Sequence, residues 1–367
     1  MSVQPGPAVL VGGMIALFAC SRLLATILPR GGGGGGDAVG IRALAYFIPI
    51  AAASLIAMLL GRSEIALGIV FGTSVGAVTT VVGFVALAGP FDGGPARLRR
   101  VWPFLLAAAL LVMVTGFKGT LNWRDAVALL TEGLILLSLW NDRRLTGGAT
   151  PQSVLDEAEA HEPHGAPRHT LHYATPSDAA GWTVVRAAVV AIELTLIGAL
   201  AWLGGWGVTR GTIGTSGLLR GMATSAIAGS VVSLAMVLPM MYGTWRQAEG
   251  GRGWAPVTSQ IAVVLLNLCA LLPVLILIPY LAAHVPAVAH WAGDALLWHE
   301  GLPKLLVFPA PMWRIDNVVL IIMGVFLLPV AIGKWNLGRE EGLVLIAGYF
   351  FYLIATVASG LDPSIGR

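Results

Sequence analysis

The chain has 367 residues, of which 56% are hydrophobic and 11% are charged, and its mean hydropathy is +0.81. Soluble domains average roughly 45–50% apolar residues, so this composition excludes an ordinary soluble protein and indicates one that crosses a membrane many times. The net charge of +3 and the pI near 9.1 are usual for a membrane protein with arginines in its loops, and we predict no nucleic-acid partner.

Ten apolar stretches approach or exceed the length of about 20 helical residues that crosses a bilayer core. They are residues 7–29, 39–60, 64–89, 101–117, 125–140, 182–205, 218–245, 257–283, 315–335 and 342–360. No basic segment precedes the first stretch and no small-residue cleavage site follows it, so we interpret it as a retained span and not a signal peptide. The predicted fold class is an all-α membrane protein with about ten transmembrane helices.

A single long polar stretch, residues 141–181, divides these spans into five and five. We therefore predict a first five-helix repeat at 1–140, a linker at 141–181 and a second five-helix repeat at 182–367. Basic residues are modestly more numerous on the side that holds the linker. This bias predicts a cytoplasmic linker, with both termini outside, in a bacterial inner membrane.

The linker contains four histidines beside acidic residues: His161, His164, His169 and His172. Imidazoles at this spacing are candidate ligands for zinc or nickel. A solvated histidine-rich loop is the simpler interpretation, because no cysteine accompanies them and proline and glycine are frequent. We predict no metal site within the membrane and no cofactor.

An internal repeat appears when the chain is laid over itself so that Pro49 meets Pro239. The stretch FIPIAAASLIAMLLGR (47–62) then aligns with VLPMMYGTWRQAEGGR (237–252), and both stretches end in Gly-Arg. A second pair, NWRDAVALLTEG and LGREEGLVLIAG, aligns at a slightly larger offset. Because each copy has an odd number of helices, the second enters the membrane from the opposite face. Inverted repeats of this kind are typical of secondary transporters, which bind substrate at mid-membrane between the repeats.

Two of the repeated regions resemble the cation/calcium exchanger superfamily, which includes sodium/calcium and proton/calcium antiporters. The similarity is carried by GRSEIALGIVFGTS (61–74) and REEGLVLIAGYFFYLI (339–354). In that family, each half has a Gly-Thr-Ser-x-Pro-Glu stretch followed by a Gly-Asn-x-x-Gly-Ser-Asn stretch. The resemblance implies the exchanger fold, but it places the liganding glutamate at Ile50 in the first half and at Met240 in the second.

The remaining family positions are also altered. The asparagine falls on Ile69 and Ser259, and the closing Ser-Asn pair falls on Thr73 with Ser74 and on Val263 with Val264. Calcium takes six to eight oxygen ligands, including carboxylates, so the resemblance implies a site with almost none. The candidate substrate-pathway residues are Pro49, Ile50, Thr73, Ser74, Pro239, Met240, Ser259 and Asn267.

Glu132 and Glu193 are the acids most deeply embedded in apolar sequence, and a carboxylate inside a membrane is a candidate for proton or ion coupling. The alternative is a structural role. Arg186 lies two turns before Glu193 and is a candidate partner for it, whereas no neighbour in sequence compensates Glu132.

Three glycines four residues apart, Gly68, Gly72 and Gly76, line one face of the third span. We predict that another helix approaches closely there.

Two functional hypotheses remain open. The first is a secondary cation antiporter with an altered or lost calcium site, whose partners are the lipid bilayer and a small cation. The second is a membrane scaffold or accessory subunit that kept the fold and binds an unidentified protein. A metal sensor working through the linker histidines is a third interpretation. The sequence has no nucleotide-binding loop or nucleophile–base arrangement, so we predict that the protein is not an enzyme.

Overall fold

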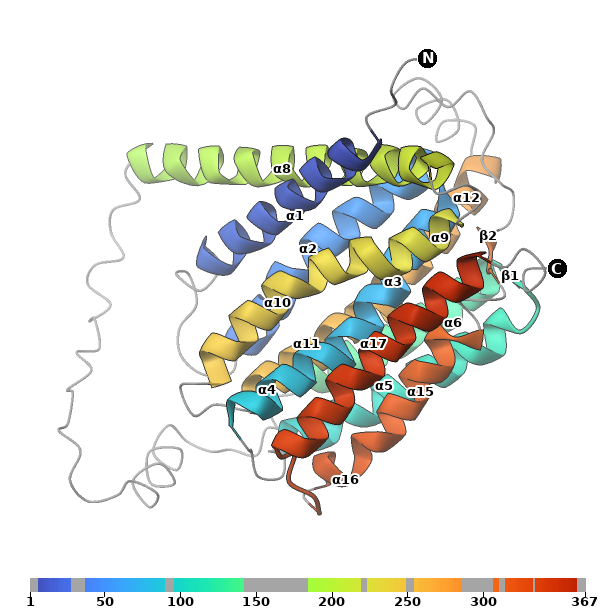
Figure 1. Cartoon of the computed structure of the whole chain (residues 1–367). Helices are drawn as coiled ribbons and strands as arrows, with labels where there is room; N and C mark the ends of the chain where they lie inside the picture. Colours follow the sequence, from blue (N-terminus) through green and yellow to red (C-terminus); the bar gives the residue numbers. More distant parts are fainter. Residues whose placement is uncertain are drawn as a thin grey trace.

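The computed structural model describes residues 6–27, 37–89, 96–141, 184–218, 223–248, 254–284, 306–309, 314–332 and 334–361. Nearly all of these residues are helical, and they form ten rods packed side by side (Figure 1). Long apolar runs favour helices in a membrane, because an α-helix satisfies its own backbone hydrogen bonds where water is absent.

Five rods come from the first half of the chain. Four of them are the single helices α1 (Gly6–Ile27), α2 (Asp37–Leu59), α5 (Ala96–Gly116) and α6 (Trp123–Asn141). The other is a composite rod between α2 and α5, in which α3 (Ser63–Gly76), η2 (Ala77–Val81) and α4 (Val82–Ala88) follow one another without a break. The η labels mark single π-helical turns inside continuous helices. Gly61, with a φ of +73°, makes the tight turn between α2 and α3, because glycine has no Cβ to oppose a positive φ.

Five further rods come from the second half. They are α8 (Val184–Leu218), the rod α9 (Thr224–Ile227), η4 (Ala228–Val232) and α10 (Ser233–Ala248), the rod α11 (Trp254–Leu266), η5 (Asn267–Leu271) and α12 (Leu272–His284), the pair α15 (Asp316–Phe326) and α16 (Leu328–Ala331), and α17 (Arg339–Leu361). The pair α15 and α16 breaks at Leu327, two residues before Pro329, because Pro329 has no amide to donate to the carbonyl of the preceding turn.

The described residues include seven rods that are long and apolar enough to cross a membrane. These are α1, α2, α3 with α4, α8, α9 with α10, α11 with α12, and α17. Helices α5 and α15 with α16 contain shorter apolar segments, and the 19 residues of α6 include Arg124, Asp125 and Glu132. The multi-pass prediction is confirmed, while the count of ten spans stays a prediction.

Corresponding rods of the two halves run in opposite directions. In Figure 1, α3 and α4 run from the upper right of the bundle to its lower left, whereas α11 and α12 run from lower left to upper right. The turn η2 begins at Ala77 and η5 begins at Asn267, so the two π-helical turns are separated by the same interval as Pro49 and Pro239. The inverted five-helix architecture is therefore present. The predicted domain boundaries at 140, 141, 181 and 182 stay a prediction.

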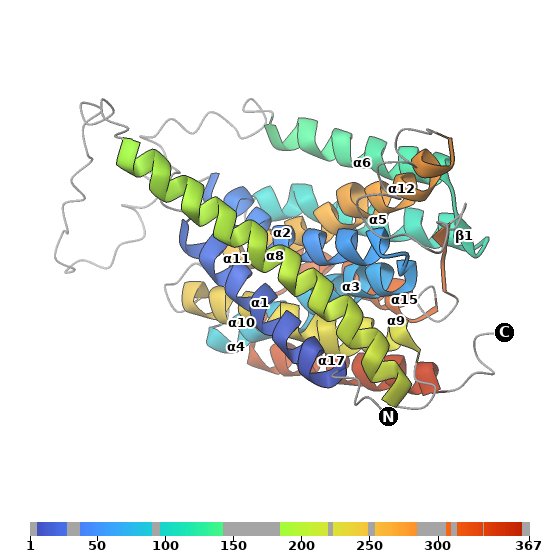
Figure 2. The same ribbon diagram turned by 90° about the horizontal axis from the view of Figure 1, so that it is seen from above.

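The sixth rod differs from its predicted range of 182–205. Helix α8 continues to Leu218, and its apolar window covers Ile192–Thr215. Threonines, glycines and Arg210 end the apolar run in sequence, but the helix continues because those glycines pack against α1 (Figure 2). An added Cβ at Gly207 would lie 2.9 Å from the Cα of Gly13, so two backbones meet there.

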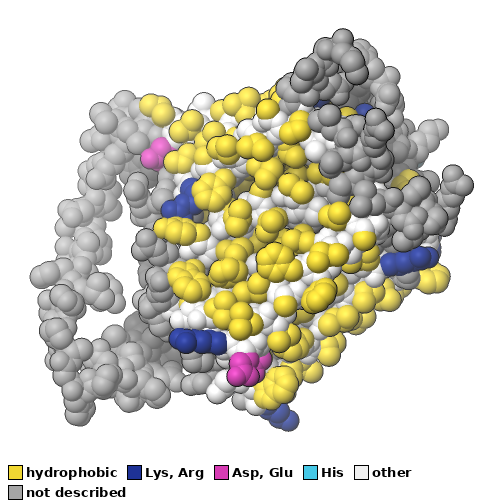
Figure 3. Space-filling model, in the orientation of Figure 1, with side chains coloured by type: hydrophobic (Ala, Val, Ile, Leu, Met, Phe, Trp, Pro, Cys, Tyr) yellow, Lys and Arg dark blue, Asp and Glu magenta, His cyan; other side chains and the backbone are white. Residues whose placement is uncertain are grey.

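The core is one large hydrophobic cluster that includes residues of both halves. Hydrophobic side chains also cover much of the outer face in Figure 3, and the charged side chains visible in that view lie toward its margins. Phe117, Phe351 and Val114 are 76%, 72% and 69% exposed. Exposed apolar side chains in such number are expected where lipid replaces water as the solvent.

A short strand pair joins the two halves at one end of the bundle. Strand β1 (Thr120–Leu121) pairs antiparallel with β2 (Leu306–Val307). The next residue, Phe308, is 2% exposed, and its ring centroid lies 5.3 Å from that of Phe71 in α3. Part of the connection between α12 and α15 is thus packed into the core.

Several sequence predictions lie outside the described residues. The linker falls there except for Asn141, and so do its four histidines and most of the connection between α12 and α15. The orientation in the membrane and the identity of that membrane stay predictions. Helix α1 begins and α17 ends at the same end of the bundle, as an even number of spans requires (Figure 1).

Candidate functional site

Both repeat prolines lie in buried positions, Pro49 within α2 and Pro239 within α10. The residues that follow them, Ile50 and Met240, are each 1% exposed and belong to the same core cluster. A proline inside a helix removes one amide donor and leaves a carbonyl of the preceding turn without its partner. In both helices the side chain beside the proline is apolar, an isoleucine or a methionine, where the family resemblance assigns a carboxylate.

The glycine face of α3 packs directly against the second half. An added Cβ at Gly68 would lie 2.8 Å from the carbonyl oxygen of Ser225, and at Gly72 it would overlap the carbonyl oxygen of Gly229 in η4. At Gly76, it would meet Val237 of α10. The predicted close helix approach is confirmed, and its partner is the bulged rod formed by α9, η4 and α10.

Three neutral polar side chains form hydrogen bonds across the interface between α3 and η5. The Asn267 amide Nδ2 donates to Thr73 Oγ1 at 3.3 Å and to Ser74 Oγ at 3.1 Å. The two hydroxyls donate to carbonyls of their own helix, Thr73 to Ile69 at 2.6 Å and Ser74 to Val70 at 2.7 Å. All three side chains are fully buried. Three predicted pathway residues are therefore brought together, and we refer to them below as the polar junction.

Other buried polar atoms have no hydrogen-bond partner among the described residues. Besides Asn267 Oδ1, these include the Ser54 hydroxyl, one turn after Ile50, and both amide atoms of Gln260 in α11. Ser259 differs, because its hydroxyl donates to the carbonyl of Pro256 at 2.7 Å. Buried polar groups without partners are rare in proteins, so these atoms are candidates for contact with water or a small polar ligand.

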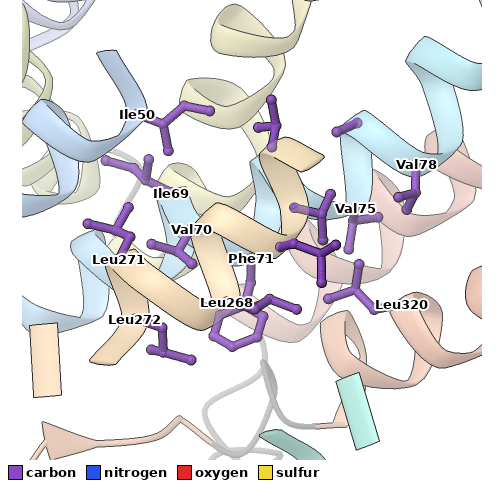
Figure 4. Packing of buried hydrophobic residues seen from close by; sticks show 14 of the residues in the cluster. Ile50, Ile69, Val70, Phe71, Val75, Val78, Leu268, Leu271, Leu272 and Leu320 are labelled. Atoms are coloured by element: carbon purple, nitrogen blue, oxygen red, sulfur yellow. The ribbon is translucent and has the colours of Figure 1, made fainter. Parts of the chain in front are cut away.

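Apolar side chains make up most of the remaining centre of the bundle. Figure 4 shows Ile50 of α2 beside Ile69 and Val70 of α3, with Leu268 and Leu271 from η5 in the same cluster. The polar junction contains no carboxylate. A calcium ion would have to exchange its hydration shell for a few neutral oxygens, and a divalent charge without counter-charge is very costly to bury.

Glu132 lies in the middle of α6, where that helix meets η5. Both of its carboxylate oxygens are buried and have no hydrogen-bond partner among the described residues. The neighbouring Gly133 contacts η5 directly, because an added Cβ there would lie 3.0 Å from the carbonyl oxygen of Cys269. An apolar cavity of about 340 Å³ adjoins this contact, and its lining includes Gly133, Cys269 and Leu134. Of the two predicted coupling residues, Glu132 is thus the one that lies beside a π-helical turn, η5.

Glu193 lies elsewhere, on the half-buried part of α8. Its neighbours in sequence, Ile192 and Leu194, are 67% and 60% exposed. The side chain of its suggested partner, Arg186, lies outside the described set. Within the described ranges, helix α8 packs mainly on α1 and α2, so Glu193 is not brought to the polar junction.

Sequence reasoning missed the buried acid Asp316 at the start of α15, which is 2% exposed. It lies at the edge of a predicted span and two residues after Arg314, which is the pattern of a surface ion pair. Arg314 is in fact exposed. Nothing in the local pattern separates a buried acid from an interfacial one at such an edge. Within the described ranges, no three His, Cys, Asp or Glu side chains are grouped to hold a metal ion.

Comparison with known proteins extends these observations. Residues 6–140 match the family model described as sodium/calcium exchanger protein. No curated protein sequence matches the chain.

Several solved structures share the fold. The H⁺/Ca²⁺ exchanger CAX matches with a TM-score of 0.60 at 13% identity, over 97% of this chain and 83% of that one. Native YfkE matches with a TM-score of 0.58 at 12% identity, over 95% of this chain and 89% of that one. The sodium-calcium exchanger NCX_Mj matches with a TM-score of 0.52 at 16% identity, over 96% of this chain and 98% of that one. The first part of the chain thus matches the sodium/calcium exchanger family model, and the whole chain shares the fold of these solved cation exchangers.

Proposed function

We propose that the protein is a secondary cation antiporter whose mid-membrane site no longer takes calcium. The observation that carries this proposal is the burial of Ile50 and Met240 at the positions where the family resemblance assigns liganding glutamates. The polar junction of Thr73, Ser74 and Asn267 offers neutral oxygens and an amide only. Neutral groups of this kind suit a monovalent cation or water better than a divalent ion, because less charge must be compensated.

Glu132 is the proposed coupling residue. Its carboxylate is buried and lacks a hydrogen-bond partner among the described residues, so it favours binding a proton or accepting a cation. Its helix contacts η5, and Asn267 at the start of η5 reaches the polar junction. A change of charge at Glu132 therefore acts on the turn that positions Asn267.

Flux measurements on the purified full-length protein in proteoliposomes test this proposal. We expect a proton gradient to drive uptake of Na⁺ or K⁺, no uptake of Ca²⁺, and a loss of uptake in Glu132→Gln. Glu340→Gln is the matched control, because Glu340 is an exposed acid and its variant should transport normally. Uptake of Ca²⁺ at a rate equal to that of the monovalent ions would overturn the calcium part of the proposal.

A scaffold or accessory subunit is the second candidate, and one observation favours it. The Thr73 and Ser74 hydroxyls both donate to carbonyls of their own helix, which is the arrangement of hydroxyls that stabilise packing without a substrate. Absence of flux for every cation in folded protein, together with a partner that remains bound through purification, would support this function over antiport.

A further inference from the structure

A small cavity with an acid and three hydroxyl side chains in its lining lies away from the polar junction, between the start of α9, the start of α15 and the end of α17. Its volume is about 30 Å³, and its polar lining consists of Ser225, Asp316, Thr356 and Ser359. Alanine, glycine and isoleucine complete the lining. A cavity of this size has room for about one water molecule or one bare ion.

Asp316 brings a formal negative charge to this cavity. The residue is 2% exposed, and none of the described Lys, Arg or His residues forms an ion pair with it. The hydroxyl of Tyr352 interacts with its carboxylate. One hydroxyl does not offset the cost of burying an ionised carboxylate, so the site calls for a positive charge.

Thr356 supplies an independent indication of a ligand. It is 8% exposed and lines the cavity, and its Oγ1, which faces the Tyr352 hydroxyl, forms no hydrogen bond of normal geometry with the described residues. Ser359 is oriented differently, because its hydroxyl donates to the carbonyl of Thr356 at 2.9 Å, which leaves oxygen lone pairs free to accept. The polar lining thus consists of oxygen atoms, which are the ligands that hard cations select.

Contacts between α9 and α17 fix two walls of the cavity relative to each other. The amide of Ala223 donates to the carbonyl of Gly360 at 3.1 Å, and Gly360 packs so closely on Ala226 that an added Cβ would overlap it. The Tyr352 hydroxyl, which interacts with Asp316, also lies 3.4 Å from the carbonyl oxygen of Gly229 in η4. The walls of the cavity are therefore fixed to the bulged rod that contains Pro239.

We propose that this cavity binds one dehydrated monovalent cation of the size of Na⁺, with Asp316 as the charged ligand. Thr356, Ser225 and Ser359 are the neutral oxygen ligands. One carboxylate balances one positive charge, whereas a divalent ion would keep an uncompensated charge and lack the six to eight oxygens that calcium takes. The proposal goes beyond antiport, because it concerns equilibrium binding that a protein without transport activity would also show.

Thermal unfolding of the purified full-length protein in detergent tests this site, with NaCl replacing choline chloride at constant ionic strength. A ligand that binds only the folded state raises the Tm as its concentration increases beyond its Kd. We expect the Tm of the wild type to rise with Na⁺ and to respond much less to Ca²⁺. Asp316→Asn and Thr356→Val should both lose the response, and Thr356→Ser should restore it. If Asp316→Asn does not fold, Thr356→Val and Thr356→Ser carry the test.

Two control variants separate this site from other acids. Glu64→Gln changes an acid that accepts a hydrogen bond from Thr224 at 3.2 Å, beside the cavity but outside its lining. Glu340→Gln changes an exposed acid of α17, the helix that carries Thr356. Both variants should keep the Na⁺ response. Because this site is assayed by binding and the proposed function by uptake, a loss of transport with an intact Asp316-dependent Na⁺ response distinguishes a failure of one proposal from a failure of the other.

A wild type whose Tm does not depend on Na⁺ would overturn the proposal, as would an Asp316→Asn variant that keeps the full response. A Tm that rises only as the pH falls, equally in choline and in sodium, would also overturn it. That result would mean that a proton on Asp316, beside Tyr352, takes the place of the cation.

Discussion

The centre of the bundle and its flanks differ in whether they contain buried acidic side chains. At the centre, Ile50 and Met240 are buried beside the repeat prolines, and the polar junction is neutral. At the flanks, two acids are embedded without ion pairs to described residues, Glu132 against η5 and Asp316 near η4. Both flanking acids are connected to a π-helical turn, a feature that occurs frequently at functional sites. The fold thus combines repeat prolines and π-helical turns at the centre with buried acids outside it.

The largest expected effect comes from restoring charge at the centre. The double variant Ile50→Glu, Met240→Glu should lower the free energy of unfolding by about 3–5 kcal/mol or more in chelator, because the carboxylates are buried without partners. Added Ca²⁺ should recover part of this loss. The measurement is thermal unfolding in detergent, with Ile50→Leu, Met240→Leu as the volume control. Full stability of the glutamate variant in chelator would show that the centre is wet, which would break the comparison.

The second prediction concerns the close contact that keeps the centre dry. Gly72→Ala places a Cβ on the backbone of Gly229 and should lower the free energy of unfolding by about 1–3 kcal/mol through overpacking. Gly12→Ala is the matched control, because an added Cβ there contacts nothing within 4 Å. Equal melting temperatures of the two variants would mean that α3 and η4 separate readily.

The third prediction sharpens the account of the polar junction. Asn267→Leu removes hydrogen bonds to Thr73 and Ser74 and should lower the free energy of unfolding by about 0.5–2 kcal/mol, the range for hydrogen bonds between membrane helices. A double-mutant cycle with Thr73→Val isolates the pair. A coupling energy of zero would show that the Asn267–Thr73 contact contributes nothing to stability.

The smallest expected effect is at the flank. Glu132→Gln should change the free energy of unfolding by less than about 1 kcal/mol, because a neutral amide replaces a carboxyl group whose oxygens have no hydrogen-bond partner among the described residues. The same variant should abolish uptake. A large loss of stability measured by thermal unfolding would instead assign Glu132 a structural role and weaken the contrast between centre and flank.

Patterns that repeat along the chain predicted much of the fold and part of the site. The offset that brings Pro49 onto Pro239 also brings η2 onto η5, and the spacing of Gly68, Gly72 and Gly76 predicted a close helix contact. Apolar runs located the membrane helices, because helix formation in lipid depends on local composition.

Features that depend on contacts between distant segments were not predictable in the same way. Asn267 was a candidate, but its reach to Thr73 and Ser74 depends on how η5 packs on α3. The burial of Asp316 depends on α9 and α17, which local sequence does not position. The continuation of α8 past its predicted end to Leu218 likewise depends on the glycine contacts with α1.

The strand pair at the end of the bundle has a mechanical consequence. It contains only two residue pairs, Thr120 with Val307 and Leu121 with Leu306, and the two leucines are each 1% exposed. Because side chains alternate along a strand, a slip by one residue would turn both leucines out of the core. We therefore expect this strand pair to hold the two halves in one register at this end of the bundle. Sliding of one half along the other would first have to separate the two strands.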